Sequence, residues 1–499
     1  MSENSKGAMA KDTVIYMIAK AIEAVVGIVM MSAMTYLFHK AQMGYYSTVN
    51  IAVTMAALIA VQWLNQSVLR YINQYDIDGR KGEFFDTVMD SWKKVNAFSV
   101  LAAVILLGLL KLAALHFQVI DSFMAVYSVR VIGCGILWFV AYNTSQLMIA
   151  MLAAVREARM NLLLSVITVC GKLFFMVLFC LLWTSRIEWI FLSYFITDGS
   201  VALLAMKRLG LFSHLRGKRD DAIFSQLKEY GMPLMGNQFA TTILNKSDIY
   251  IVLIGVGAGA AGIYQTNYSL VATAFTLINA AIMRGCYPTI LRRWSEGKKE
   301  EVQVLLNEAV RMYLLIAVPA VAGVWAISRQ AAEALFAAEY VEGHTVMFWV
   351  ALGMMFLGLT EYSIKHWELS ANTPAIFKRS MIGGAVNVAL NLVLVNLLDS
   401  YFVAAVTTFA GFFVYFLLAR WGTRKNLKWQ LQPRTFINIL LSAGIMAGAI
   451  KGLEHLLPGG KLYLALFVLC GIIVYGLCLA ATGEIRGEIR AVVSRLKRR

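Results

Sequence analysis

Charged residues are scarce in this sequence. Only 15% of its 499 residues are Asp, Glu, Lys or Arg, whereas 59% are hydrophobic and the mean hydropathy is +0.67. A soluble domain carries roughly 25% charged and 45–50% apolar residues, so this composition excludes an ordinary soluble protein. Apolar runs of about 18 residues or more, the length of a membrane-spanning helix, recur along the sequence. The alternating segments of a membrane β-barrel are absent, which leaves a polytopic α-helical membrane protein.

Motifs of the common enzyme classes are also missing. The sequence has no G-x-x-x-x-G-K-[ST] phosphate loop, no G-x-S-x-G nucleophile motif and no H-E-x-x-H zinc motif. All six cysteines lie within apolar runs, which favours small core residues over disulfides or metal ligands. We therefore expect no catalytic residue, no metal site, no cofactor and no ATPase activity in this chain.

The hydropathy pattern predicts fourteen membrane spans. Their approximate limits are 12–38, 44–71, 95–116, 123–151, 160–184, 187–206, 231–254, 262–290, 309–328, 344–369, 377–397, 401–420, 434–453 and 461–482. The first run has full span length and no small-residue cleavage site, so we expect a transmembrane helix there and not a signal peptide.

The positive charges follow the spans. The net charge of +16 could suggest nucleic acid. However, Lys and Arg concentrate near the N-terminus, in the loops after even-numbered spans and at the C-terminus, and few lie on the other side. The positive-inside rule then predicts a multi-pass membrane protein with both termini in the cytoplasm, and no nucleic-acid partner.

An internal repeat divides the chain. Shifting the sequence by 218 positions places Gly44-x-Tyr46-x-Thr48 on Gly262-x-Tyr264-x-Thr266 without a gap. Six spans precede the long basic linker, so the repeat is parallel about an axis along the membrane normal. The expected regions are an N-lobe over 1–210, a cytoplasmic linker over 211–229, a C-lobe over 230–422, two further helices over 423–483 and an amphipathic basic tail over 484–499 that lies on the membrane surface.

Ionisable residues inside the predicted spans are candidates for function, because such charges are costly in lipid. The cations are Lys20, Arg130, Lys172, Lys246, Arg284 and Lys365, and the acids are Glu23, Asp198, Asp248 and Glu361. The excess of cations predicts a positive cavity that attracts an anionic cargo. The acids are candidates for ion pairing or for coupling to H⁺ or Na⁺.

Structural explanations compete with this interpretation at several positions. Lys20 and Glu23 share a helical face, as do Glu361 and Lys365, so each pair can neutralise itself. Arg130 and Arg284 lie near span ends, where a long side chain can reach the interface. Lys172 lies too centrally for that. Lys246 and Asp248 point to different faces, which predicts that Asp248 pairs with another helix and Lys246 faces the cavity. Asp198 stands alone as a candidate proton site.

Several short motifs follow one another along the chain. These motifs are Gly44-Tyr45-Tyr46, Leu69-Arg70-Tyr71, Tyr230-Gly231-x-Pro233-Leu234, Ser247-Asp248, Ala261-Gly262-Ile263-Tyr264, Pro288, Pro319 and Asn387-x-x-x-Asn391. Together they resemble bacterial polysaccharide flippases of the O-antigen type, and the resemblance covers nearly the whole chain. That family belongs to the multidrug/oligosaccharidyl-lipid/polysaccharide exporter superfamily.

The resemblance implies two six-helix lobes around a central cavity. It also implies a cargo of lipid-linked oligosaccharide on undecaprenyl pyrophosphate, moved from the cytoplasmic to the outer leaflet by alternating access for surface polysaccharide biosynthesis. A glycan polymerase or glycosyltransferases are further expected partners, besides bilayer lipids. The alternatives are a cation-coupled drug antiporter of the same superfamily, a lipid II flippase and a non-transporting scaffold for glycan assembly.

Overall fold

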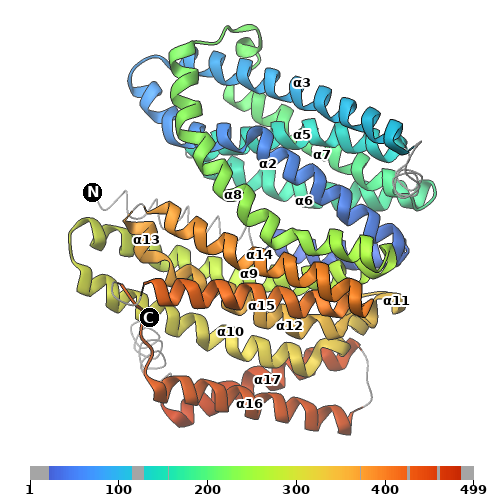
Figure 1. Ribbon diagram of the computed structural model, residues 1–499, viewed down its shortest axis with the longest axis vertical. Coiled ribbons are helices and arrows are strands. Elements are labelled where there is room, and N and C mark those ends of the chain that lie inside the picture. The colour runs from blue at the N-terminus through green and yellow to red at the C-terminus, as the bar shows by residue number, and fades with distance from the viewer. Residues whose placement is uncertain are drawn as a thin grey trace. The chain divides into compact units, whose positions relative to one another are not determined.

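The chain is helical throughout the residues that the structure describes. The computed structural model describes residues 22–114, 129–155, 157–370, 372–423, 427–457 and 461–484, and no strand occurs in these ranges (Figure 1). Within them, twelve helices are long and apolar enough to cross a membrane. The polytopic all-α architecture predicted from composition is confirmed.

The helices divide into two series along the chain. The first comprises α2 (Lys40–Ile77), α3 (Lys81–Ala114), α5 (Val129–Ala154), α6 (Ala158–Leu182), α7 (Ile187–Leu209), the 3₁₀ turn η1 (Ser213–Arg216) and α8 (Asp221–Gly255). The second comprises α9 (Ala258–Ser295), α10 (Lys299–Leu335), α11 (Ala338–Val341), α12 (His344–Ser363), α13 (Lys365–Leu369), α14 (Thr373–Leu398), α15 (Tyr401–Gly422), α16 (Pro433–Leu456) and α17 (Lys461–Thr482).

Two predicted spans fall outside the set of twelve. Span 1 is described only from residue 22, where the apolar segment Ile22–Leu37 forms a shorter helix. Span 7 lies within α8, a helix of 35 residues whose middle carries Asn, Gln, Thr, Lys and Asp. Those polar residues lower the hydropathy of α8, although its length suffices to cross a bilayer at 1.5 Å per residue. The amphipathic tail predicted after residue 484 lies outside the described residues.

The chain divides into two compact units, Met1–Ile243 and Leu244–Arg499. This division falls inside α8, whereas the sequence predicted a linker over 211–229 before the second lobe. The lobe limits predicted from the repeat stay predictions.

The internal repeat is confirmed over one helix and the turn that follows it. Helix α2 and helix α9 both have 38 residues, and a shift of 218 carries the limits of the first onto the limits of the second. The shift also carries Gly79, with φ of 72°, onto Gly297, with φ of 75°. Each glycine adopts the left-handed conformation that ends the helix and turns the chain.

Charged residues in this turn are repeated as well. Arg80 pairs with Glu83 at 2.6 Å, and Lys298 approaches Glu301 at 3.8 Å at the equivalent positions. Lys298 and then Arg293 donate hydrogen bonds that hold the pKa of the exposed Glu296 carboxyl below its usual value. Exposed pairs of this kind add little stability.

The first unit has a continuous apolar core between α2, α5 and α7. Leu64, Val68, Leu147, Met148 and Val201 are fully buried in it. The linker closes this core at the end where α3 begins. In the linker, His214 Nδ1 lies 2.7 Å from Asp86 Oδ1, and the Asp220 amide donates to Thr87.

The first half of α8 packs closely against α2. Ser67 Oγ donates to the Leu227 carbonyl at 2.6 Å, and Tyr75 donates to Gln226 at 2.6 Å. At Gly231 a Cβ atom would lie only 2.1 Å from the Trp63 carbonyl oxygen. The two backbones can therefore approach this closely only because residue 231 has no side chain.

We expect Gly231→Val to destabilise the first unit by about 1–3 kcal/mol, the usual range for overpacking. Gly236→Val is the matched control in the same helix, because a Cβ atom there meets nothing within 4 Å. Thermal unfolding of both purified full-length variants in detergent measures the difference. Equal melting temperatures would show that the contact with Trp63 does not limit stability.

The second unit packs α15 against α12 and α14, and α10 against α9, α12 and α16 (Figure 1). Gly383 on α14 and Gly411 on α15 each face the other helix, where a Cβ atom would meet a carbonyl oxygen at 3.0 Å. Such small residues allow close helix contact in membranes. Helices α16 and α17 pack against α10, so the last two predicted spans belong to this unit.

The six cysteines form no disulfide. Only Cys180 is buried, Cys170 is exposed and the other four are partly exposed. The interpretation of the cysteines as core residues is therefore correct for Cys180 alone. Periodicity of an apolar run does not separate lipid-facing from core-facing positions, because both faces are apolar.

Candidate functional site

Lys172 and Asp198 form a buried ion pair in the first unit. Lys172 Nζ on α6 lies 2.9 Å from Asp198 Oδ2 on α7, with side chains 15% and 1% exposed. Trp138 on α5 donates its indole N–H to the same carboxylate oxygen at 2.8 Å. Asp198 does not stand alone, as its sequence neighbourhood suggested, because its partners come from two other helices.

Aromatic rings surround the Lys172 ammonium group. Its Nζ lies 4.9 Å from the centre of the Tyr194 ring and 5.9 Å from that of Tyr142. The hydroxyl groups of Tyr194 and Tyr46 lie 2.8 Å apart, which extends the polar cluster to α2. Ring faces attract a cation, so these two tyrosines supply favourable contacts for the ammonium group in addition to the carboxylate.

Asp248 is the centre of a second polar cluster, in the second unit. Its side chain is 3% exposed and accepts hydrogen bonds from Tyr264 on α9 and from Thr408 on α15, the latter at 3.3 Å. The Ile249 amide donates to its other oxygen at 3.0 Å. Asp248 thus pairs with other helices, as the spacing from Lys246 predicted, but its partners are neutral donors.

Lys246 has a different environment. Its Nζ lies 5.7 Å from the centre of the Tyr268 ring, and no carboxylate within the described ranges forms an ion pair with it. Because Asp248 is satisfied by neutral donors, the positive charge of Lys246 is not cancelled by direct pairing. An unpaired cation inside a span needs water or an anionic ligand.

Buried amides extend the second cluster along α14 and α15. Asn391 donates to Asn387 at 2.6 Å, and Thr407 donates to Asn391 at 2.7 Å. All three side chains are at most 2% exposed. The Asn387-x-x-x-Asn391 motif noted in the sequence therefore joins α14 to α15 through hydrogen bonds. The next residue on α15, Thr408, is the one that donates to Asp248.

Lys365 lies at a break between α12 and α13. It is 3% exposed and pairs with Glu368 at 2.5 Å, while Glu361 lies 4.0 Å away. The Tyr287 ring centre lies 4.8 Å from its Nζ. Two carboxylates beside one ammonium group favour a structural role here, which was the interpretation that the i, i+4 spacing supported.

The other predicted residues lie apart from these clusters. Arg130 is exposed near the start of α5, whereas Arg284 on α9 and Glu23 in the segment Ile22–Leu37 are partly exposed. Lys20 lies outside the described residues. The structure therefore brings Lys172 together with Asp198 and Lys365 together with Glu361. It does not join all the predicted cations into one cluster within either unit.

Several polar partners were missed by sequence reasoning. Trp138, Tyr264 and Thr408 donate hydrogen bonds to the buried carboxylates, and the Tyr194 ring lies against the Lys172 ammonium group. Aromatic and hydroxyl residues are common in membrane spans and carry no distinctive spacing. A usable signal would have been the repeat itself, since Tyr46 and Tyr264 are equivalent and each contributes its hydroxyl group to a cluster.

Two protein-family models each match more than half of this sequence. One, described as "Lipid II flippase MurJ", matches residues 176–470, and the other, described as "Polysaccharide biosynthesis protein", matches residues 9–294. The chain belongs to the flippase class of the multidrug/oligosaccharidyl-lipid/polysaccharide exporter superfamily. A search of curated protein sequences gives no significant match.

Solved structures of this superfamily share the fold of the flippase. A structure titled "Lipid II flippase MurJ, inward closed conformation" has a TM-score of 0.72 at 13% identity and covers 96% of this chain and 100% of its own. An inward-facing multidrug resistance MATE transporter has a TM-score of 0.62 at 11% identity, and the match covers 82% of this chain and 94% of the transporter. A Vibrio cholerae MATE transporter variant has a TM-score of 0.53 at 13% sequence identity, and the match covers 85% of this chain and 99% of the transporter.

The two clusters give this flippase an uneven distribution of charge. In the first unit the ammonium group of Lys172 is neutralised by Asp198, whereas in the second unit Lys246 lacks a carboxylate partner among the described residues. Each cluster links helices through one carboxylate, so a change in protonation or ligand at that carboxylate would alter how those helices are held together.

Proposed function

We propose that this flippase moves an oligosaccharide linked to undecaprenyl pyrophosphate from the cytoplasmic to the outer leaflet of the inner membrane, for surface polysaccharide biosynthesis. Alternating access exposes the cargo site first to one side and then to the other. The cationic residues proposed to hold the pyrophosphate are Lys20, Arg130, Lys172, Lys246 and Arg284. Lys365 is instead assigned to pairing with Glu368 and Glu361. The observation that carries the proposal is Lys246, an intramembrane cation without a carboxylate partner among the described residues.

A pyrophosphate is the ligand that suits such a cation. Its oxygens accept several charge-assisted hydrogen bonds, each worth about 1.5–3 kcal/mol. Binding in a region of low dielectric strengthens the attraction and offsets the cost of removing the lysine from water. A cationic drug would be repelled at the same position.

Lys172 is a second cation that could bind the pyrophosphate, but it already has a carboxylate partner. Asp198 occupies its ammonium group at 2.9 Å, so an incoming phosphate must displace or share this carboxylate. If Asp198 is protonated when Lys172 binds the cargo, proton binding and cargo binding are coupled. Asp198 is thus our first candidate for the coupling residue, followed by Asp248, Glu23 and Glu361, with H⁺ or Na⁺ as the coupling ion.

Lipid II is the second candidate cargo. The lipid II flippase family model covers residues 176–470, which includes both Lys246 and the Asp248 cluster. The polysaccharide model covers residues 9–294, which includes both Lys172 and Lys246. The polysaccharide assignment rests on that family model and on the motifs that extend along nearly the whole chain. The proposed partnership with a glycan polymerase or glycosyltransferases depends on this assignment.

Loss of the protein distinguishes these cargoes. In cells that lack it, we expect a lipid-linked oligosaccharide to accumulate in the inner leaflet and surface polysaccharide to fall, with restoration by the wild-type chain. Extraction of polyprenyl-linked intermediates and mass spectrometry identify the accumulated species. Accumulation of lipid II would favour the second candidate, and normal levels of every lipid-linked intermediate would contradict both.

A further inference from the structure

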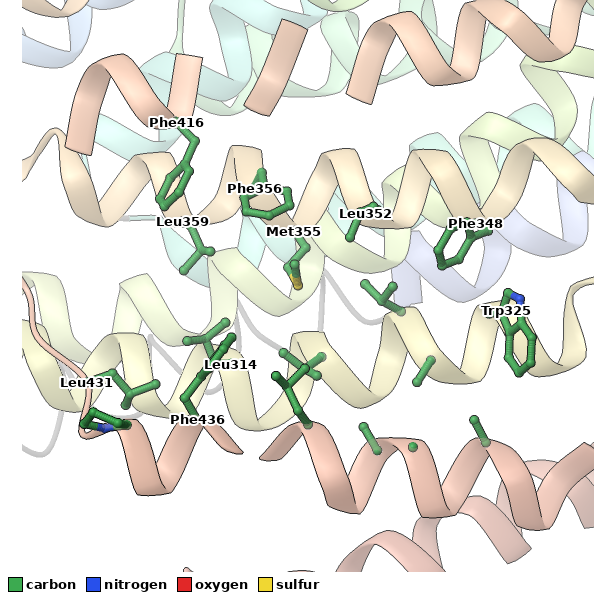
Figure 2. Close-up of a pocket in the computed structure, with 18 of the residues that line it drawn as sticks. Leu314, Trp325, Phe348, Leu352, Met355, Phe356, Leu359, Phe416, Leu431 and Phe436 are labelled. Atoms are coloured by element: carbon green, nitrogen blue, oxygen red, sulfur yellow. The ribbon is translucent and has the colours of Figure 1, made fainter. Parts of the chain in front are cut away.

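A long apolar groove lies within the second unit, between α10, α12 and α16 (Figure 2). Its volume is about 990 Å³ and its lining is almost entirely apolar. Leu431 and Phe436 lie at one end and Trp325 at the other (Figure 2). A groove of this composition fits a hydrocarbon chain, because it offers very few hydrogen-bonding groups to a water-soluble ligand.

Two glycines on α16 help to keep the groove open. Gly444 and Gly448 line it one helical turn apart, and a Cβ atom at either position would meet nothing within 4 Å. Glycine in a helix interior is normally unfavourable unless a close contact requires it. No such contact exists at these two positions, so their effect is to leave space along the groove.

Among the described residues that line the groove, Arg420 near the end of α15 is the single charged one. Its guanidinium carbon lies 3.8 Å from the centre of the Trp429 ring, and Trp429 is itself fixed by a hydrogen bond of 3.0 Å to Ser363. Arg420 Nη1 is buried and has no hydrogen-bond partner in the part of the chain that the structure describes. A buried donor without a partner is unusual, and an acceptor atom of a bound ligand would supply the missing hydrogen bond.

The other end of the groove differs. Lys451 approaches the Trp325 ring there, with its Nζ 5.8 Å from the ring centre, but it is paired with Glu454 at 2.8 Å. Within the described ranges, a carboxylate therefore compensates the positive charge at the Trp325 end, whereas none pairs with Arg420 at the other end. This asymmetry specifies the orientation of a ligand that has one anionic end and one apolar end.

We propose that the groove binds an anionic glycerophospholipid, with its phosphate on Arg420 and an acyl chain along α16. From Pro433 to Gly448 the helix rises about 22 Å at 1.5 Å per residue, which exceeds the ~15 Å of one hydrocarbon leaflet. The guanidinium fork matches the geometry of a phosphate better than an ammonium group does. The charge pattern of the sequence places the Arg420 end in the cytoplasmic leaflet, which carries the anionic lipids.

The bound lipid is distinct from the cargo, and this proposal does not depend on which cargo is moved. The test uses the purified full-length chain in mild detergent, with dioleoyl phosphatidylglycerol or dioleoyl phosphatidylcholine added, and native mass spectrometry counts retained lipids. Both lipids carry a phosphodiester, but the choline ammonium group of phosphatidylcholine is repelled by Arg420. Two unit charges about 4 Å apart in water repel by about 1 kcal/mol, so we expect about fivefold preferential retention of one phosphatidylglycerol.

Three variants make the test specific. Arg420→Gln should bring the two lipids to similar retention, whereas Lys378→Gln, which removes an exposed cation elsewhere in the same unit, should leave the preference intact. Gly448→Leu fills the groove without touching the charge and should reduce retention of both lipids. Unchanged retention in Arg420→Gln or in Gly448→Leu would overturn the proposal. So would stabilisation by inorganic phosphate equal to that by the lipid, or displacement of the lipid by undecaprenyl phosphate at equal concentration.

Discussion

Replacing Lys246 by Gln is expected to reduce export of the lipid-linked glycan by tenfold or more. The substitution removes an intramembrane ammonium group that contacts the Tyr268 ring and forms no ion pair with a carboxylate of the described residues. One charge-assisted hydrogen bond to a phosphate contributes about 1.5–3 kcal/mol, which corresponds to roughly 10- to 150-fold in affinity. Complementation of a strain that lacks the protein, with surface polysaccharide as the measured quantity, gives the effect.

Two control variants separate a cargo contact from a folding defect. Lys246→Arg keeps the charge and should retain most export, whereas Lys378→Gln changes the net charge equally at an exposed position and should leave export unchanged. Asp248 is held by neutral donors, so Lys246→Gln should also leave the melting temperature close to that of the wild type. Wild-type export by Lys246→Gln would refute the role of Lys246 in binding the pyrophosphate.

The fold was largely predictable from sequence because lipid imposes strict rules on the backbone. Long apolar runs must be helices, so the architecture follows from composition. The repeat was readable because turn residues such as Gly79 and Gly297 need a special conformation and keep their spacing. The limits of the helices were less predictable. Helices α2 and α3 continue beyond the apolar runs into polar segments, where hydropathy gives no signal but the i to i−4 hydrogen bonds persist.

The candidate site was only partly predictable. Sequence spacing finds partners on the same helix, so it correctly associated Glu361 with Lys365. It could not find the partner of Lys172, because Asp198 lies on the next helix and no rule of local spacing connects the two. Nor could it tell that Asp248 is satisfied by Tyr264 and Thr408, since hydroxyl groups are frequent in such helices. Pairing between helices depends on the packing angle and rotation of each helix, which hydropathy does not determine.

Asp198→Asn is expected to destabilise the protein by about 3–5 kcal/mol, the usual cost of leaving one member of a buried ion pair without its partner. The Asn side chain can still accept the Trp138 hydrogen bond, so the loss reports mainly the uncompensated charge of Lys172. Thermal unfolding in detergent measures this effect. A melting temperature equal to that of the wild type would mean that Lys172 and Asp198 do not interact as a charged pair.

The double variant Lys172→Gln/Asp198→Asn decides between a structural and a functional pair. It removes both charges, so we expect it to regain most of the stability lost in Asp198→Asn, with a coupling energy of about 1–3 kcal/mol. If Lys172 also binds the pyrophosphate, this stable variant will still export little glycan. Restored export would instead assign the pair to helix packing, because neutral side chains that fill the same space would then suffice. Restored export would also contradict the proposed coupling through Asp198. Asp248 would then be the other buried carboxylate, within the described ranges, that could sense the coupling ion.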